Sequence, residues 1–529
     1  MSATTRDGMP STTTDVAVWS KMASSCPRRP FQLLKVQAML PLNTSTLASF
    51  GPTVTRPTYD RSRLRAGIVH FGVGNFHRVH QAIAIEACLH HPGQEEWAIC
   101  GVGLTDGPAA RAKAEAYRRQ DNLYTVTQLT SPAPRDTQIV GAMIDYLHAP
   151  ADPEAVLARL ADPATRIVSL TITEGGYNID ETTGAFRLDT PDIRHDLEGG
   201  PPRTVFGYIV AALARRRQAG LPPFTVMSCD NLPRNGDTSR LAVLGFARAL
   251  DPGLADWIEA NGAFPNSMVD RIAPQVPEDE RRRITAGIGV EDLVAATCEP
   301  YTSWVVEDRF CAGRPELERA GVVFSSEVPA YVAVKGRLSN AAHMLMCYPS
   351  LLMGARLVDE GMRHPDIPRL LHAFWERDAR RLVEPPAGYS TRAFTDTVIE
   401  RFANPAIKDQ LLRVAGDGAS KIVVFHGKTI GQLIAGGSDL AREAFLLACF
   451  ARYLGGVDDR SIAFDIFEPR IGEADWQRLQ SGDPLAVLDI EAFAGLGLRQ
   501  SPAFVAAYQI QSKSLASQGT AATLAQLLK

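Results

Sequence analysis

The chain has 529 residues, of which 45% are hydrophobic and 22% are charged, and its formal net charge is -4. This length is too great for one small core and predicts two large domains. The composition is that of a globular protein, and the weak negative charge gives no electrostatic case for a nucleic acid or an anionic membrane as partner. No apolar run reaches the length that spans a bilayer.

The eight cysteines are scattered along the chain and include no Cys-x-x-Cys pair. This spacing is unlike that of a zinc site or a disulfide framework, so we expect no metal and a reducing compartment, the cytoplasm. The sequence leaves the oligomeric state open, with a monomer as the working expectation.

Residues 1–38 are rich in Ser, Thr and Pro and are predicted to be a disordered tail. Basic residues outnumber acidic ones there, as in a transit peptide, but no continuous apolar segment for secretion is present. The alternative, which we favour, is that Met39 is the true start of the protein.

The first domain, residues 39–324, is predicted to alternate strands and helices. The pattern gives strands at 67–71, 97–104, 123–129, 167–173 and 224–228, with helices at 81–89 and 109–119. Continuous apolar strands between helices indicate a parallel sheet that is covered on both faces. We therefore expect an α/β fold with a Rossmann-like, doubly wound N-terminal domain.

The second domain, residues 325–529, lacks strand signals. Its pattern predicts helices at 331–358, 366–383, 394–416 and 440–455, with breaks at Pro385-Pro386 and at Gly436-Gly437-Ser438. We expect a mostly α-helical C-terminal domain and a substrate site in the cleft between the two domains.

A glycine-rich turn, Gly72-Val73-Gly74-Asn75-Phe76-His77, follows the first predicted strand. Gly72 fits the tight turn of the Rossmann fingerprint, and Gly74 fits the close approach of a pyrophosphate to a helix N-terminus. His77 stands where the third glycine is usual. Because the turn lies between a strand and a helix, we expect residues Gly72, Val73, Gly74, Asn75 and Phe76 to bind a dinucleotide.

Asp106, just past the second predicted strand, is the candidate partner of the adenosine ribose. The alternative is that it is an ordinary turn residue in Thr105-Asp106-Gly107-Pro108. The nearest following arginine, Arg111, lies inside the next predicted helix, so NAD is preferred over NADP as the cofactor.

Two polar clusters follow apolar strands: Thr173-Glu174-Gly175-Gly176-Tyr177 and Cys229-Asp230-Asn231-Leu232-Pro233. Both lie at carboxyl ends of predicted parallel strands, where ligands bind in open α/β sheets. Gly, Asn and Asp also suit ordinary turns, which is the alternative reading. We assign Glu174 to cofactor binding, and Asn231 is placed to face Lys335 across the cleft.

The stretch from Tyr331 to Ser350 is a largely apolar predicted helix that carries three polar residues, Lys335, Asn340 and His343. At roughly 100° per residue, Asn340 lies about 140° around the helix from Lys335 and His343 about 80°, so all three fit on one broad face. One reading is a core helix whose polar groups are all satisfied. The other is alcohol oxidation, in which a desolvated Lys acts as base, Asn donates to the alkoxide and a neutral His orients a second hydroxyl.

With these residues assembled, the chain resembles the mannitol 2-dehydrogenase family, the polyol-specific long-chain dehydrogenases. The Lys-x4-Asn-x2-His spacing is specific to that family, and SWVVEDRFCAGRPELERAGV is most similar to its mannitol branch. The resemblance covers nearly all of the chain except the tail and rests on GIVHFGVGNFHRVHQA, TEGGYN, SCDNLPRNG, MVDRIAP, VEDRFCAGRP, KGRLSNAAH, RFANPAI and DGASK.

The resemblance implies that Lys335 is the general base and that Asn231 and Asn340 form the oxyanion site. It places His343, Arg413 and Lys421 on substrate-orienting positions, although on their own Arg413 and Lys421 read as surface charges. The implied reaction is oxidation of D-mannitol at C2 to D-fructose, with hydride passing to NAD and no metal. The alternatives are a D-arabinitol dehydrogenase, a fructuronate reductase or a non-catalytic NAD-binding sensor.

The chain departs from the family pattern at two positions. Val332 stands where relatives carry a Glu that helps to pass the proton from the Lys to solvent, which leaves the turnover rate and the substrate open. Asn75 replaces a family Gly in the phosphate loop, which affects the fit of the cofactor.

Overall fold

The computed structural model describes residues 39–130, 136–180, 183–274 and 277–529, and residues Leu40–Lys529 form one compact unit. The predicted tail, residues 1–38, lies outside the described residues. None of the helices in these ranges combines the length and the apolar character needed to cross a bilayer. The cysteines in the same ranges are unpaired: Cys88, Cys100, Cys229, Cys298, Cys311, Cys347 and Cys449.

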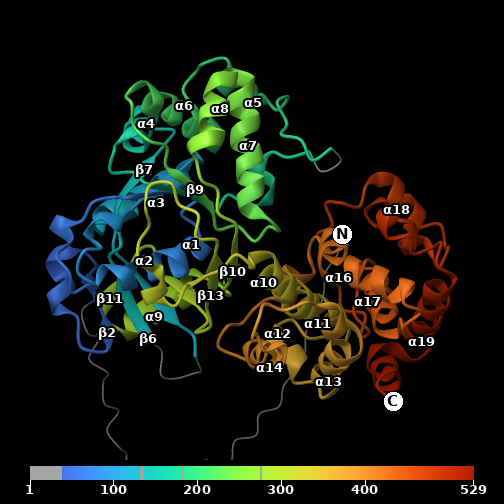
Figure 1. Cartoon of the computed structure of the whole chain (residues 1–529). Helices are drawn as coiled ribbons and strands as arrows, with labels where there is room; N and C mark the ends of the chain where they lie inside the picture. Colours follow the sequence, from blue (N-terminus) through green and yellow to red (C-terminus); the bar gives the residue numbers. More distant parts are fainter. Residues whose placement is uncertain (1–38, 131–135, 181–182, 275–276) are drawn as a thin grey trace, which may run out of the picture. The chain divides into compact units, whose positions relative to one another are not determined.

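A five-stranded sheet forms the centre of the N-terminal half (Figure 1), in the order β7-β4-β3-β8-β9. All neighbouring strands pair in parallel. The chain moves from the central strand to one edge and then returns to build the other side, which is the strand order of a Rossmann sheet. The doubly wound domain is therefore confirmed; its strands are β3 (Ile68–Phe71), β4 (Ile99–Gly103), β7 (Met143–His148), β8 (Ile167–Leu170) and β9 (Thr225–Ser228).

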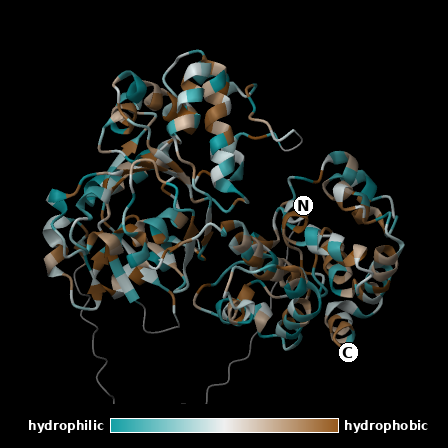
Figure 2. Ribbon diagram, viewed as in Figure 1, coloured by the Kyte–Doolittle hydropathy of each residue, from teal (hydrophilic) through white to brown (hydrophobic). Residues whose placement is uncertain are grey.

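Successive residues of a strand point to opposite faces of the sheet. All four residues of β3 are buried, so both faces of this sheet are covered. Val69 and Phe71 pack into a core with α4, α6, α7 and α8, whereas Ile68 packs into a second core with α1, α2 and α3. Figure 2 shows hydrophobic and hydrophilic residues alternating along such helices, as expected when one face is buried. The helices are α1 (Asn75–Val79), α2 (Gln81–Leu89), α3 (Pro108–Arg119), α4 (Pro153–Ala161), α5 (Pro191–Leu197), α6 (Val205–Gln218), α7 (Asn235–Leu250), α8 (Pro252–Asn261) and α9 (Glu278–Gly287).

The strand predicted at 123–129 exists but lies in a different sheet. As β5 (Tyr124–Gln128) it pairs antiparallel with β6 (Asp136–Val140), in a four-stranded sheet that β2 (Val54–Thr55) and β12 (Ala296–Cys298) complete. The third Rossmann strand is instead β7, whose side chains are mostly half-buried and whose mixed sequence gave no continuous apolar signal. Smaller sheets join β10 (Ser267–Asp270) to β13 (Ser303–Val306) and β14 (Val323–Phe324), and β1 (Leu40–Pro41) to β11 (Val290–Glu291).

After β14 the described residues form helices and a few single β-type residue pairs, and they contain no further strand. This confirms the mostly α-helical second half, whose apolar residues form one large core around Leu345, Trp375 and Phe445. Its helices are α10 (Val328–Val334), α11 (Ala341–Leu352), α12 (Val358–Met362), α13 (Asp366–Phe374), α14 (Thr391–Phe402), α15 (Leu411–Ala415), α16 (Gly418–Ala435), α17 (Ala441–Tyr453), α18 (Glu473–Leu479) and α19 (Pro502–Leu527).

The helix predicted across Tyr331 to Ser350 is continuous but not uniform. Between α10 and α11 the residues Lys335–Asn340 form a π-helical turn, in which the Ala341 N–H donates to the carbonyl five residues back, Gly336 O. A π turn takes more residues to complete a circle than an α turn. The separation of about 140° that 100° per residue predicts for Lys335 and Asn340 is therefore wrong. In a π turn, side chains five residues apart point in more similar directions than they do in an α-helix.

Candidate active site

The carboxyl ends of β8 and β9 are tied together by the buried side chain of Asp230. Its carboxylate accepts hydrogen bonds from the backbone N–H of Ile172 at 3.0 Å and of Thr173 at 2.9 Å, and from the Tyr177 hydroxyl at 2.7 Å. Three donors satisfy a charge that would otherwise be costly to bury. This arrangement fixes the loop that presents the next residue, Asn231.

Thr173 occupies a strained backbone conformation in the same loop, with a φ of 63°. A positive φ is unusual for a β-branched residue, and such strain persists where surrounding contacts over-determine the backbone. The bond from its N–H to Asp230 is one such contact. Glu174, the residue that follows, is exposed and begins a short 3-10 turn.

Lys335 and Asn231, predicted to face each other, do meet. The Lys335 Nζ donates to the Asn231 Oδ1 at 2.5 Å, across 104 residues of sequence. Lys335 is only 8% exposed. Burial lowers the pKa of its ammonium, and the nearby Arg401 lowers it further, while Asp270 and Glu174 oppose the shift. The geometry thus gives a lysine that loses its proton more readily than a lysine in water.

A buried ion network that the sequence reasoning missed lies beside Lys335. The Arg401 guanidinium, on α14, donates to both carboxylate oxygens of Asp270 at 3.0 Å and to both of Glu299 at 2.9 and 2.8 Å. Burial alone would raise the pKa of Asp270, but Arg401 and Lys335 together lower it. An Asp at the end of the strand Ser267–Asp270 was the available signal, since strand ends face the ligand edge of a sheet.

His343 lies on α11 and is largely but not fully buried, with 17% of its side chain exposed. Burial lowers its pKa to about 4, against the opposing charge of Asp409, so the imidazole is neutral at pH 7. Its ring stacks on Phe402 with centroids 4.3 Å apart, and its Nε2 atom, 3.9 Å from Asp409, is buried without a hydrogen-bond partner among the described residues. A neutral ring with one free nitrogen can orient a hydroxyl group.

Asp409 also holds one of the two predicted substrate-binding cations. The Arg413 guanidinium donates to the Asp409 carboxylate at 2.8 and 2.6 Å, so Arg413 and His343 share one acidic partner. Lys421 is engaged differently, because its Nζ donates to the carbonyls of Val414 at 3.0 Å and Gly416 at 2.5 Å, at the end of α15. The structure therefore places Arg413 with His343 and uses Lys421 as a cap for a helix C-terminus.

The glycine-rich turn has the backbone that its glycines predict. Gly72 has a φ of 92°, and a Cβ there would lie 2.0 Å from the Thr171 carbonyl oxygen, so only glycine fits. At Gly74 a Cβ would meet only Gly72 O, at 3.7 Å, which leaves open space above the loop. His77, in place of the third glycine, stacks on His70 of β3 with centroids 3.5 Å apart and so holds α1 to the strand.

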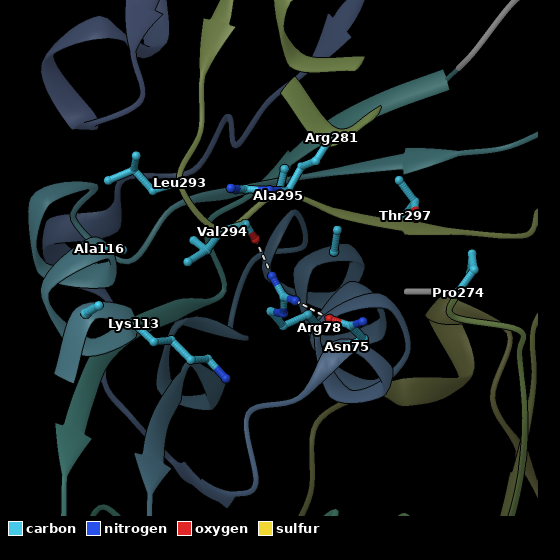
Figure 3. Close-up of a pocket in the computed structure, with 12 residues that line it drawn as sticks. Asn75, Arg78, Lys113, Ala116, Pro274, Arg281, Leu293, Val294, Ala295 and Thr297 are labelled. Carbon is cyan, nitrogen blue, oxygen red and sulfur yellow. Dashed lines mark hydrogen bonds between the residues drawn. The ribbon is translucent and has the colours of Figure 1, made fainter. Parts of the chain in front are cut away.

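A cavity of about 650 Å³ adjoins this loop and is drawn in Figure 3. Arg78, Lys113 and Arg281 supply positive charge to its wall, and among the described residues that line it none carries a carboxylate. The Arg78 guanidinium donates to the Val294 carbonyl and to the Asn75 side chain. Neither Arg78 nor Lys113 was singled out from the sequence, although Arg78 lies only a turn beyond the glycines.

The remaining predicted cofactor residues are Val73, Phe76 and Asp106. The Lys113 Nζ donates to the Val73 carbonyl, and Phe76 stacks on His80 with centroids 4.7 Å apart. Asp106 is exposed and forms an ion pair with Arg111 at 3.0 Å. Arg111, the nearest arginine that could contact the 2′-phosphate of NADP, is therefore paired with the predicted ribose partner.

Val332, the departure from the family pattern, lies in an apolar contact. Together with Tyr331 it packs on a small core of Met268, Val305 and Val328, between α10 and the strands β10 and β13. Within the described ranges, no group of three or more His, Cys, Asp or Glu side chains is arranged to hold a metal ion.

Comparison with known proteins matches both halves of the chain. The description "Mannitol dehydrogenase Rossmann domain" matches residues 66–319, and "Mannitol dehydrogenase C-terminal domain" matches residues 327–516. A polyol:NADP oxidoreductase of Gluconobacter oxydans is 45% identical, over 86% of this chain and 93% of its own. A mannitol 2-dehydrogenase of Phaeosphaeria nodorum is 40% identical, over 96% of this chain and 88% of its own.

A solved structure agrees with these matches. The ternary complex of Pseudomonas fluorescens mannitol 2-dehydrogenase with NAD and D-mannitol superposes with a TM-score of 0.83 at 40% identity, covering 92% of this chain and 99% of that one. On these grounds, the chain belongs to the mannitol dehydrogenase family, a family of oxidoreductases.

Proposed function

We propose that the chain is an NAD-dependent polyol dehydrogenase that oxidises D-mannitol at C2 to D-fructose. The observation that carries the proposal is the contact of the buried Lys335 with Asn231, a lysine of lowered pKa held against an amide at a strand end. In this proposal residues 39–324 bind the cofactor and residues 325–529 supply the base and the substrate contacts. The mannitol-bound relative supports this choice of substrate.

Lys335, in its neutral form, removes the proton of the substrate hydroxyl as a general base. The side-chain amides of Asn231 and Asn340 donate hydrogen bonds to the alkoxide that develops. The neutral imidazole of His343 and the paired Arg413 orient other hydroxyls of the polyol. Burial of Lys335 excludes water, which strengthens each of these interactions.

The residues of the glycine-rich turn fit a dinucleotide. Gly72 makes the sharp turn, Gly74 leaves open space above the loop, and the neighbouring cavity carries the charges of Arg78 and Lys113 for phosphate oxygens. When bound, NAD accepts the hydride from the carbon that carries the hydroxyl. Asp106 would accept hydrogen bonds from the ribose hydroxyls, which favours NAD over NADP.

The test is an assay of the purified protein. We expect reduction of NAD with D-mannitol and oxidation of NADH with D-fructose, both faster than with D-arabinitol or D-sorbitol and faster than with the NADP cofactors. Preference for D-arabinitol would move the assignment to that substrate, and activity with fructuronate but not fructose would identify a uronate reductase.

Val332 supports one second candidate, a non-catalytic NAD-binding sensor, because it removes the carboxylate that in relatives passes the proton to solvent. This reading predicts tight binding of NAD without turnover on the whole polyol panel. Measurable oxidation of any polyol would exclude it.

A further inference from the structure

The π turn at Lys335–Asn340 gives the candidate site a geometry that an α-helix lacks. Its hydrogen bonds run from an N–H to the carbonyl five residues back. Residues five apart, such as Lys335 and Asn340, then lie about one turn apart and leave the helix in similar directions. In a regular α-helix the same residues would diverge by about 140°.

Such a turn contains one more residue than the α turn it replaces, and so one more carbonyl than its amides can satisfy. A buried carbonyl without a partner is costly, so other groups must supply the donor. One side chain does so here, since the Trp375 Nε1 donates to the Leu338 carbonyl at 2.8 Å. A second buried ring borders the end of the turn, where the His426 Nε2 lies 2.9 Å from the carbonyl of Ala341, the first residue of α11.

Both rings are completely buried, Trp375 and His426 each being 0% exposed. The second ring nitrogen of His426 lies 2.9 Å from the carboxylate of Glu443, which is 1% exposed. The two ring nitrogens of His426 therefore lie against two oxygen groups at once, the Ala341 carbonyl and the Glu443 carboxylate. Glu443 thereby fixes the ring that holds the backbone of α11.

Arg337, a residue of the π turn, makes a further set of contacts with the helical half. The Arg337 guanidinium donates to the Leu382 carbonyl at 2.6 Å and to the Thr429 hydroxyl at 3.1 and 2.9 Å. Arg337 is 7% exposed, so the turn is anchored to α16, which carries Thr429 and His426, and to the segment that follows α13. None of these anchoring side chains touches Lys335 itself.

We infer that Trp375 and the buried pair His426–Glu443 are positioning residues, which hold the π turn and thereby align Lys335 with Asn340. The catalytic roles of Lys335 and Asn340 rest on the proposed function, whereas the contacts that hold the turn do not. A base and an oxyanion donor must both reach one substrate oxygen, and small displacements of such groups reduce rates strongly.

The principal test is Trp375→Phe, which keeps most of the ring and removes the indole N–H. We expect kcat for mannitol oxidation to fall on the order of 10- to 100-fold, with the Kd for NAD unchanged and the rising limb of the pH profile displaced. A crystal structure of the variant should show the turn at 335–340 altered and the contact of Lys335 with Asn231 lengthened.

Trp97→Phe is the matched control, since Trp97 is also buried (5% exposed) but lies in the N-terminal half. It should leave kcat, the pH profile and the π turn unchanged. Glu443→Gln is the second variant, which keeps the shape and weakens the donor at His426. Glu443→Gln replaces Trp375→Phe as the test of the positioning role if the latter does not fold. We expect it to lower kcat and to displace the pH profile and the turn in the same way, but by less.

Crystal structures separate this inference from the proposed function. Should the wild-type protein oxidise no polyol, the proposed function fails, yet a turn that shifts in Trp375→Phe or Glu443→Gln still supports the positioning role. A folded Trp375→Phe protein that keeps the bond from the Ala341 N–H to Gly336 O, the Lys335 contact and the wild-type pH profile overturns it.

Discussion

The two halves of the candidate site are fixed in different ways. Asn231 is held at a strand end, where the Asp230 carboxylate accepts two backbone amides and a tyrosine hydroxyl. Lys335 is held on a helix, where the backbone leaves the α conformation for a turn. The strand half is fixed by hydrogen bonds from its backbone to one carboxylate, and the helix half by hydrogen bonds between its turn and side chains of the helical core, so the two should respond differently to substitution.

The largest effect is expected from the helix half. Lys335→Met keeps the volume and removes the base, so kcat/KM for NAD-linked mannitol oxidation should fall about 10²- to 10⁴-fold. The midpoint of thermal unfolding should not fall, because an apolar group replaces a buried amine. Wild-type activity in a folded Lys335→Met protein would rule out the proposed base.

The strand half is tested by Asn231→Ala. Loss of one oxyanion donor should lower kcat about 10²- to 10³-fold while the Kd for NAD stays the same. Asn340→Ala is the matched variant on the helix, and a similar loss would show that the two halves contribute equal donors. A loss confined to one of the two variants would assign the alkoxide to that half alone.

Much of the strand half could be predicted from the sequence, and less of the helix half. Asn231 ends an apolar strand, and the rule that ligands gather at such ends does not depend on side-chain detail. Lys335 was singled out from its apolar surroundings, but the π turn was not, since the pattern of residues 331–350 fits a uniform α-helix. The structure shows that the two side chains meet; their catalytic roles are predictions.

Contacts between residues far apart in the sequence were the hardest to predict. Arg401 contacts Asp270 and Glu299 across more than 100 residues, and nothing in the local pattern around Arg401 distinguishes it from a surface arginine. The prediction that residues 123–129 belong to the Rossmann sheet failed for a related reason, because an apolar run does not reveal which sheet it joins. Local patterns give the elements, whereas packing between distant segments decides their partners.

A smaller effect is expected when the counter-charge of Lys335 is changed. Asp270 raises the pKa of Lys335, so Asp270→Asn should lower that pKa further. The base is active when neutral, and kcat/KM for mannitol oxidation rises with pH as Lys335 loses its proton. Its rising limb should therefore move to lower pH in Asp270→Asn, and in the same direction but by less in Glu174→Gln. A move to higher pH would contradict the electrostatic account.

The smallest effect is expected at Val332, which lies one helical turn before Lys335. Val332→Glu restores the family carboxylate and adds a negative charge near the base, so the rising limb should move to higher pH. Val332→Gln, of matched size without charge, should leave the limb in place. Equal profiles for the two variants would show that the apolar contact with Met268 and Val305 keeps the new carboxylate away from the lysine.

The contact of Lys335 with Asn231 bridges 104 residues and joins the Rossmann half to the helical half. Neither half alone contains both groups, so a refolding chain can recover its secondary structure long before it recovers turnover. Enzyme assays would then time the docking of the two halves, while far-ultraviolet circular dichroism would time the folding of each.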